Sequence, residues 1–252
     1  MADAPQLCLG YRHLYNLEFD EAHRCFQQWG KQYPDDPLAP VSDAAAYLFA
    51  ELDRMHLLQS EFFVNDEQFI TRQQTTADPD LRQKFEAALA LSQKLADRIL
   101  AQTPRDPNAT FANILRFGLH ADYLALIDRS YLRSLSEMKT ARQLAEGLLL
   151  NNPTLYDAYL AIGVENYLLS LKPAPIRWML RMTGSQTDKE VGIQKLRMTA
   201  ENGQYLQPYA CLLLSVAALR DRDWNHAKEL LQDLATQFPH NQLYVQELAR
   251  LR

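Results

Sequence analysis

Apolar and small residues recur at helical spacing along the chain, and this pattern begins close to the first residue. In the stretch LEFDEAHRCFQQWGKQYPDDP, residues 17 to 37, Ala22 and Phe26 lie four positions apart among charged and amide side chains. That spacing places apolar residues on one face of an α-helix. The most apolar window, YACLLLSVAAL at 209–219, is about half the length that a membrane-spanning helix needs, so we expect a buried helix there. The pattern predicts an all-α protein.

A second stretch, RDWNHAKELLQDLATQFPHNQ, repeats the first one near the other end of the sequence. The matched pairs are Phe19 with Trp224, Asp20 with Asn225, Ala22 with Ala227, Phe26 with Leu231 and Pro34 with Pro239. The aromatic residue is expected to close a turn between two antiparallel helices. The Asp or Asn is expected to accept hydrogen bonds from the first amides of the second helix. The Ala allows close helix contact, and the Pro ends the unit.

This repeated unit resembles the tetratricopeptide repeat, a helix–turn–helix of about 34 residues. The residues that carry the resemblance are Gly10, Ala22, Phe26 and Pro34 in the first unit, Ala44 and Tyr47 in the second, Ala141 and Pro153 in the third, and Tyr159, Ile162 and Gly163 in the fourth. The segments IRWMLRMTG, DKEVGIQKL and ENGQY, together with ELDRMHLLQSEFF, are similar to bacterial relatives of the eukaryotic tetratricopeptide repeat protein 39 and inclusion body clearance family. The resemblance implies a fold but no defined activity.

Asp-Pro and Asn-Pro junctions divide the chain into helix pairs. PDDPLA at 34–39 recurs as PRDPNA at 104–109, and in each an Asp precedes a Pro as a helix N-cap precedes the first helical residue. The expected pairs are 3–36, 37–106, 107–153, 154–205 and 206–240, followed by a C-terminal capping helix, NQLYVQELARLR. Stacked pairs bury a continuous core. We therefore expect one domain, 1–252, built as a right-handed superhelical solenoid.

Two of these pairs are longer than the repeat requires. An insertion at about 57–81 carries Phe62, Phe63, Phe69 and Ile70, and it is expected to be either a structural flap or a binding element. A second insertion, at 172–187, has Arg177, Trp178 and Arg181 on a stretch, Ile176 to Met182, that is long enough for two helical turns. A cationic segment with Trp can rest on a membrane surface or a partner. The alternative is that it fills a groove or lengthens one edge of the solenoid.

Composition narrows the classes of function. The formal net charge is −5, from 26 basic and 31 acidic residues, with no long run of one sign, which argues against nucleic-acid binding. The start, MADAPQLC, has no visible export signal, so we expect a cytoplasmic protein. The alternative is an exported, periplasmic protein whose signal peptide has been removed, because bacterial members of the similar group commonly carry one.

No catalytic motif is found in the sequence. It has no glycine-rich phosphate loop, no nucleophile elbow and no metal-ligand spacing among its histidines and three cysteines. We therefore expect no enzyme activity, no cofactor and no metal. The alternative of a small-ligand site or enzyme beneath the 57–81 flap would use His120, Glu165 and Asn166.

The resemblance also implies a concave groove lined by the first helix of each pair. Counted onto this sequence, the expected groove residues are Tyr11, Tyr15, Phe49, Phe111, Leu115, Tyr167 and Tyr209. An apolar, aromatic lining suits an amphipathic protein segment. The leading hypothesis is thus a non-catalytic protein–protein interaction scaffold that binds such a segment. A membrane-surface adaptor that uses residues 173–184 is the alternative.

Overall fold

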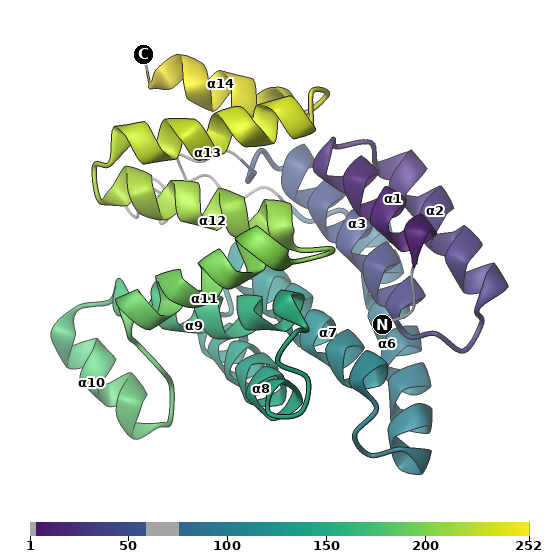
Figure 1. The fold of residues 1–252 in the computed structure, drawn as a ribbon. Helices are drawn as coiled ribbons and strands as arrows, with labels where there is room; N and C mark the ends of the chain where they lie inside the picture. The colour runs from purple at the N-terminus through teal and green to yellow at the C-terminus, as the bar shows by residue number, and fades with distance from the viewer. Residues whose placement is uncertain (1–3, 59–75, 252) are drawn as a thin grey trace. The chain divides into compact units, whose positions relative to one another are not determined.

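The chain folds as an all-α protein (Figure 1). The computed structural model describes residues 4–58 and 76–251, and these form 12 α-helices and one short 3-10 helix. No β-strand occurs among these residues. Every helix in this part of the chain is too short or too polar to span a membrane. The predicted fold class, all-α, is confirmed.

The chain divides into two compact units, and two helices contribute to both. Unit 1 runs from Ser92 to Ala210, and unit 2 combines the chain up to Leu91 with the chain from Cys211 onward. The helices shared between them are α6, Pro79–Gln102, and α12, Gln207–Arg220. The prediction of a single domain over 1–252 stays a prediction.

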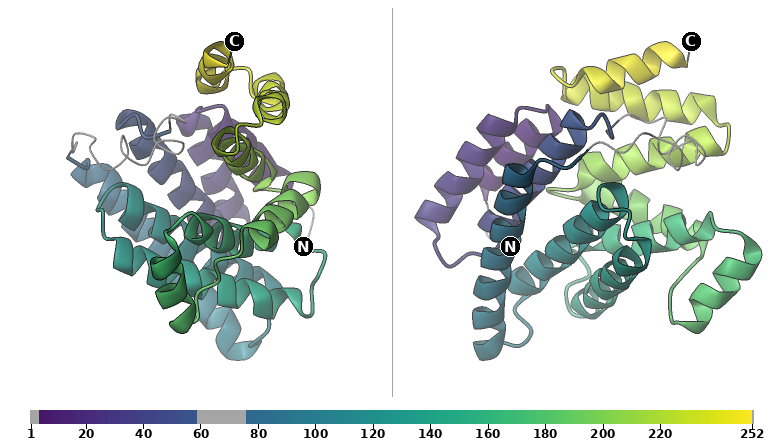
Figure 2. Two further views of the ribbon diagram at one scale, coloured as in Figure 1. Left: turned by 90° about the vertical axis from the view of Figure 1, so that its left-hand side faces the viewer. Right: turned by 180° about the vertical axis from the view of Figure 1, so that it is seen from behind.

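The regular structure of both units is helical (Figure 2). Unit 1 contains α7 (Pro107–Leu126), α8 (Tyr131–Leu149), the 3-10 helix η1 (Tyr156–Ala158), α9 (Tyr159–Ser170), α10 (Ala174–Met182) and α11 (Lys189–Asn202). Unit 2 contains α1 (Pro5–Tyr15), α2 (Phe19–Gln32), α3 (Leu38–Arg54), α13 (Trp224–Gln237) and α14 (Gln242–Arg250). Helices adjacent in sequence pack in antiparallel pairs, among them α1 with α2, α7 with α8, and α13 with α14. This packing is consistent with a helical repeat, as predicted.

The two similar sequence stretches adopt the same local structure. Helices α2 and α13 begin at the matched residues Phe19 and Trp224 and both contain 14 residues. The turn before each helix holds one residue in the left-handed region, Leu17 with φ 62° and Arg222 with φ 61°. The matched small and apolar positions are buried in both helices, as expected for Ala22, Ala227, Phe26 and Leu231.

The expected capping residues of these two helices were wrong. Asp20 and Asn225 lie inside the first helical turn, and the N-cap positions are Glu18 and Asp223. The carboxylate of Asp223 accepts a hydrogen bond from the backbone N–H of His226 at 3.2 Å. Glu18 makes no such bond. The left-handed residue places the N-cap directly after it, two positions earlier than the repeat pattern suggested.

The Asp-Pro junctions begin helices as predicted, with a shift of one position in one case. Asp106 is the N-cap of α7 and accepts from the N–H of Ala109 at 2.8 Å, and Pro107 is the first helical residue. At α3 the N-cap position is Pro37. Asp36 accepts there from the N–H of Leu38 at 3.0 Å and from the indole N–H of Trp29 at 2.7 Å. It therefore ties the start of α3 to α2.

Close helix contacts depend on glycine in both units. A Cβ at Gly192 of α11 would lie 2.6 Å from the backbone nitrogen of Tyr167 in α9. A Cβ at Gly10 of α1 would lie 2.4 Å from the ring of Phe26 in α2. Both distances are shorter than van der Waals contact allows, so these helices approach as they do because the residue is glycine.

The first and last helix pairs contact each other within unit 2. The side-chain amide of Asn241, just before α14, donates to the backbone carbonyl of Tyr15 at 2.9 Å. The N–H of His240 donates to the side chain of Asn16 at 3.1 Å, and the rings of Tyr15 and Phe238 are 5.6 Å apart. A linear stack, in which each pair contacts only its neighbours, does not predict these contacts.

The two predicted insertions have different outcomes. Residues 59–75 of the 57–81 segment lie outside the described residues, while its last three residues, Pro79–Leu81, begin α6. The predicted helical turns at Ile176 to Met182 are present as α10, which starts two residues earlier.

Candidate functional site

The local sequence around residues 172–187 determines where α10 begins and ends. Pro173 is the N-cap with extended backbone, and Pro175 lies in the first turn, where its missing N–H costs no hydrogen bond. After Met182 the chain reverses at Gly184, whose φ of 83° suits glycine. The N–H groups of Gly184 and Ser185 then donate to the carbonyls of Arg181 and Leu180. The result is a nine-residue helix with a defined end.

Most large apolar side chains of α10 are exposed to solvent. The exposed fraction is 42% for Ile176, 66% for Trp178, 56% for Met179 and 70% for Met182, whereas Leu180 is buried. Among the helices that lie wholly within unit 1, extensive contacts join α7 to α8, α8 to α9 and α9 to α11, and none involves α10. In Figures 1 and 2, α10 projects away from α8, α9 and α11. The helix thus presents an unpartnered apolar face.

The same segment contains three basic residues and no acidic one. Residues 171–187 include Lys172, Arg177 and Arg181 and no Asp or Glu. The guanidinium of Arg177 donates to the carbonyl of Lys172 at 2.8 Å, and that of Arg181 donates to the hydroxyl of Thr187 at 2.7 Å. Both acceptors are neutral. Within the described part of the chain, none of the three basic side chains forms an ion pair with a carboxylate, so their charges are not directly neutralised.

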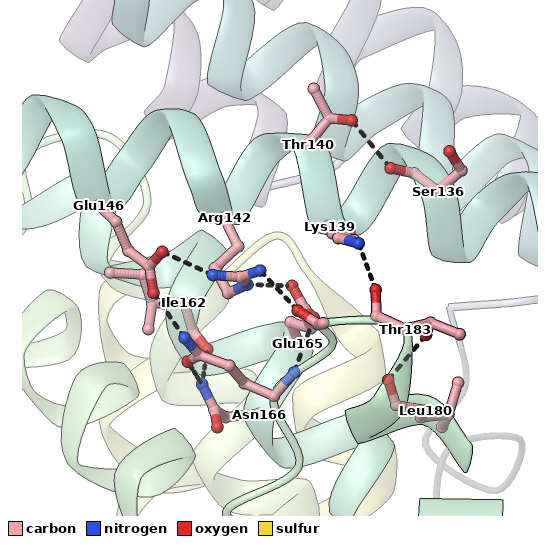
Figure 3. Close-up of polar contacts among 12 residues, drawn as sticks. Ser136, Lys139, Thr140, Arg142, Glu146, Ile162, Glu165, Asn166, Leu180 and Thr183 are labelled. Carbon is pink, nitrogen blue, oxygen red and sulfur yellow. Dashed lines mark hydrogen bonds and ion pairs between the residues drawn. The ribbon is translucent and has the colours of Figure 1, made fainter.

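A buried ion pair lies beneath the end of this segment (Figure 3). The Arg142 guanidinium of α8 donates through Nε to the Glu165 carboxylate of α9 at 2.7 Å, and through Nη1 to Glu146 at 2.5 Å. It also donates through Nη2 to the backbone carbonyl of Gly184 at 3.1 Å. Burial lowers the pKa of Arg142, but Glu165 and Glu146 outweigh that effect and raise its pKa overall. Arg142 is therefore charged.

The remaining polar groups of this cluster hold the loop that follows α10. The other oxygen of Glu165 accepts from the N–H of Gln186 at 3.0 Å. The Asn166 side chain donates to the Gln186 side chain at 2.8 Å and accepts from the N–H of Asp188 at 3.1 Å. Lys139, on α8, donates to the carbonyl of Thr183. The loop from 183 to 188 is thereby fixed to α8 and α9, and with it the C-terminal end of α10.

The predicted groove residues are distributed over both units and are mostly buried. Tyr11, Tyr15, Phe111, Leu115 and Tyr167 are buried, and Phe49 and Tyr209 are half-buried. The ring of Tyr15 contacts those of Tyr11 and Phe49, at 6.4 and 6.3 Å between centroids. These side chains hold helices together within their units. That they also contact a partner stays a prediction.

Tyr209 has a polar partner that the sequence did not indicate. Its hydroxyl donates to the Asp122 carboxylate of α7, with the oxygens 3.4 Å apart, inside unit 1. Burial raises the pKa of Asp122 to about 7, and the hydrogen bond from Tyr209 opposes that rise. Burial, together with Asp122, raises the pKa of Tyr209. Asp122 is thus a carboxyl group that is partly protonated near neutral pH.

The residues of the predicted ligand site have separate partners. His120 lies 3.3 Å from the Glu137 carboxylate, between α7 and α8. Glu165 and Asn166 are engaged with Arg142 and with the loop at 183–188. In the described part of unit 1, no hydrogen bond or ion pair joins His120 to either residue, and no group of three or more potential metal ligands occurs among the described residues. Most of the flap under which this site was expected lies outside the described residues, so the small-ligand alternative stays a prediction.

Two members of the buried cluster could be singled out from the sequence, and two could not. Two polar residues, Glu165 and Asn166, stand out in the apolar helix sequence YLAIGVENYLL and were named as candidates for a ligand site. They bridge α9 to its neighbours. Arg142 and Gln186 were missed, because each lies in a polar stretch where nothing distinguishes a buried side chain from an exposed one.

No family model, no curated protein and no solved structure matches this chain. The exposed face of α10 and the loop that holds it are therefore the features that point to a function.

Proposed function

We propose that the protein is a non-catalytic docking module that binds a partner surface through the exposed face of α10. The observation that carries this proposal is the exposure of Ile176, Trp178, Met179 and Met182 on one short helix. Large exposed apolar patches on folded proteins mark interaction sites. Trp is the residue type most enriched at the energetic centre of interfaces.

Burial of the exposed face of α10 against a partner is expected to be energetically favourable. Removing one such large side chain from water stabilises a complex by about 1.5–3 kcal/mol if burial is complete. The loop after α10 is held by Arg142, Glu165 and Asn166, so little backbone ordering is needed on binding. Preorganisation of this kind raises affinity by lowering the entropy cost of association. The buried cluster supports the docking face without contacting the partner.

For the fold, we propose a tetratricopeptide-like helical repeat related to the bacterial group named above. The matched helices α2 and α13, with the same start, length and turn, support this assignment. The contacts between the first and last pairs depart from a simple solenoid. The competing explanation is the groove hypothesis, which is tested separately at Phe49 in unit 2 and at Tyr209 in unit 1.

The experiment is affinity capture from extract of the source cells, with soluble and membrane fractions analysed separately. The docking variant is Trp178→Ser/Met179→Ser/Met182→Ser, all at exposed positions. The matched control is Leu132→Ser/Leu150→Ser, since both side chains are 85% exposed on α8 or at its end. We expect the docking variant to lose bound material and the control to retain it.

Circular dichroism shows whether each variant has kept its helices. A docking variant that stays folded and captures as much as the native chain contradicts the proposal. In that case Phe49→Ala and Tyr209→Ala variants test the groove instead.

A further inference from the structure

We infer that the surface bound by α10 is an anionic lipid membrane. The inference rests on the docking role proposed above and specifies its partner. Helix α10 would lie in the headgroup region, with Trp178, Met179 and Met182 inserted and with Lys172, Arg177 and Arg181 facing lipid phosphates.

The helical positions of these residues fit that orientation. At about 100° per residue, Trp178 lies roughly opposite Leu180, the buried residue that faces the protein. Met179 and Met182 lie to one side of Trp178, and Arg177 and Arg181 lie to the other. The most exposed position of the helix is therefore occupied by the indole ring of Trp178, which lies between an apolar side and a cationic side of the helix. Trp prefers this boundary in membranes, because its ring is apolar and its N–H is polar.

The charge of the segment selects an anionic surface. Three basic residues within 171–187 have no acidic residue among them, although the whole chain carries a formal charge of −5. The hydrogen bonds of Arg177 and Arg181 to neutral oxygens leave their charge available. Charges on the rest of the protein are screened beyond about 8 Å at physiological ionic strength. The basic residues of this segment therefore determine how strongly it is attracted to an anionic surface that it touches.

The shape of the site favours a lipid surface over a protein groove. Helix α10 projects from α8, α9 and α11 (Figures 1 and 2), and its Trp178, Met179 and Met182 side chains are more than half exposed. A protein partner would need a complementary hollow, whereas a lipid surface accommodates a projecting amphipathic helix without one. The Met side chains are flexible and pack against irregular surfaces. Exposure, charge and shape therefore point to the same class of partner.

Binding through so short a helix is expected to be weak and reversible. With nine residues, α10 inserts few side chains, and stable anchoring to a membrane takes more than one such signal. The inference predicts a peripheral association that high salt reverses, since phosphate attraction contributes part of it.

The test is flotation of the full chain with two kinds of vesicle. One is equimolar phosphatidylcholine and phosphatidylglycerol, and the other is phosphatidylcholine alone. We expect the native chain to float with the anionic vesicles, to float much less with the neutral ones, and to be released by high salt. The Trp178→Ser/Met179→Ser/Met182→Ser variant should lose about tenfold or more in partitioning. The Leu132→Ser/Leu150→Ser control should behave as the native chain.

Two further variants separate the contributions of charge and insertion. Lys172→Glu changes an exposed side chain and should lower binding to anionic vesicles, while leaving the weak binding to neutral vesicles unchanged. Fluorescence reports insertion, because Trp178 entering the membrane shifts its emission to shorter wavelength. The chain has three Trp residues, so the shift should disappear in Trp178→Phe, a variant expected to keep most of its vesicle binding.

Three results would overturn the inference: no flotation of the native chain with anionic vesicles, equal flotation with both vesicles, or native-like flotation of the triple variant. A different outcome is that the native chain does not float with vesicles but captures a soluble protein that the triple variant fails to capture. In that case the lipid inference fails and the docking function stands. If capture is also unaffected by the triple variant, both fail.

Discussion

The guanidinium of Arg142 lies 2.7 Å from the carboxylate of Glu165, and the two side chains are only 5% and 0% exposed. A buried ion pair of this kind rarely adds net stability over a well-packed apolar pair, because both charges lose their hydration. The role of this pair is to hold neighbouring segments in position. It joins α8 to α9 and provides hydrogen bonds to Gly184 and Gln186, on the loop after α10.

Removing one member of the pair should therefore cost more than removing both. We expect Arg142→Met to lower the free energy of unfolding by about 3–5 kcal/mol, because Glu165 is left charged and buried. The double variant Arg142→Met/Glu165→Leu should recover much of that loss. Denaturant unfolding measures both effects. The control is Arg24→Met, which breaks an exposed pair with Glu21 and should change little. Equal losses in the single and double variants would contradict this account.

Two glycine-to-alanine substitutions should change stability in opposite directions. Gly192→Ala places a methyl group against the backbone of Tyr167, so α9 and α11 must separate, at a cost of about 1–3 kcal/mol. Gly118→Ala, inside α7, meets nothing within 4 Å and should stabilise by about 0.5–1 kcal/mol, because alanine favours the helix. Thermal unfolding of the two variants distinguishes them. A destabilised Gly118→Ala variant would show that local packing is not as described.

The turn before α13 should be improved by glycine. Arg222 is exposed and has a φ of 61°, a conformation that costs a residue with a Cβ about 1–2 kcal/mol. Arg222→Gly should thus raise the free energy of unfolding by up to about 1 kcal/mol. The same substitution at Arg220, the last residue of α12, should lower the free energy of unfolding, since glycine disfavours helix. Denaturant titration tests both, and a loss at Arg222 would contradict the strain argument.

Asp122 should make the stability depend on pH. Its pKa is raised to about 7 by burial, whereas an unfolded Asp titrates near 4. Between these values the unfolded chain has released a proton that the folded chain retains, so the free energy of unfolding falls as pH rises from about 4 to 7 and is then level. The loss is on the order of 2–4 kcal/mol.

The variant Asp122→Asn keeps an acceptor for the hydroxyl of Tyr209 and removes the titrating group. Compared with the native chain, it should show no such loss between pH 4 and 7. Unfolding of both chains across this range is the measurement. Parallel pH profiles for the two chains would show that Asp122 is not responsible.

Local features of the fold were predicted from the sequence because they depend on nearby residues. The match of Phe19 with Trp224 located the start of two helices, and Asp106 with Pro107 located a third. The caps at Asp20 and Asn225 were wrong, because a left-handed residue in the turn leaves no mark when it is Leu17 or Arg222 rather than glycine.

Relationships between distant residues were not predictable in this way. Arg142 and Glu165 are on different helices, and the exposure of Trp178 depends on how α10 leaves α9. The amphipathic pattern of α10 was visible in the sequence, but it fits a groove filler and an exposed helix equally. Only the contacts of the neighbouring helices show that this face is unpartnered.

The division of unit 2 between the two ends of the sequence affects the order in which the protein folds on the ribosome. Unit 1 is one continuous segment, from Ser92 to Ala210, so its core can form as soon as that segment has emerged. Unit 2 begins earlier in the chain but includes the segment after Cys211. In unit 2, Tyr15 can make its contacts with Phe238 and Asn241 only after those residues have been synthesised. Of the two units, the one whose sequence begins earlier is therefore the one whose core is completed later.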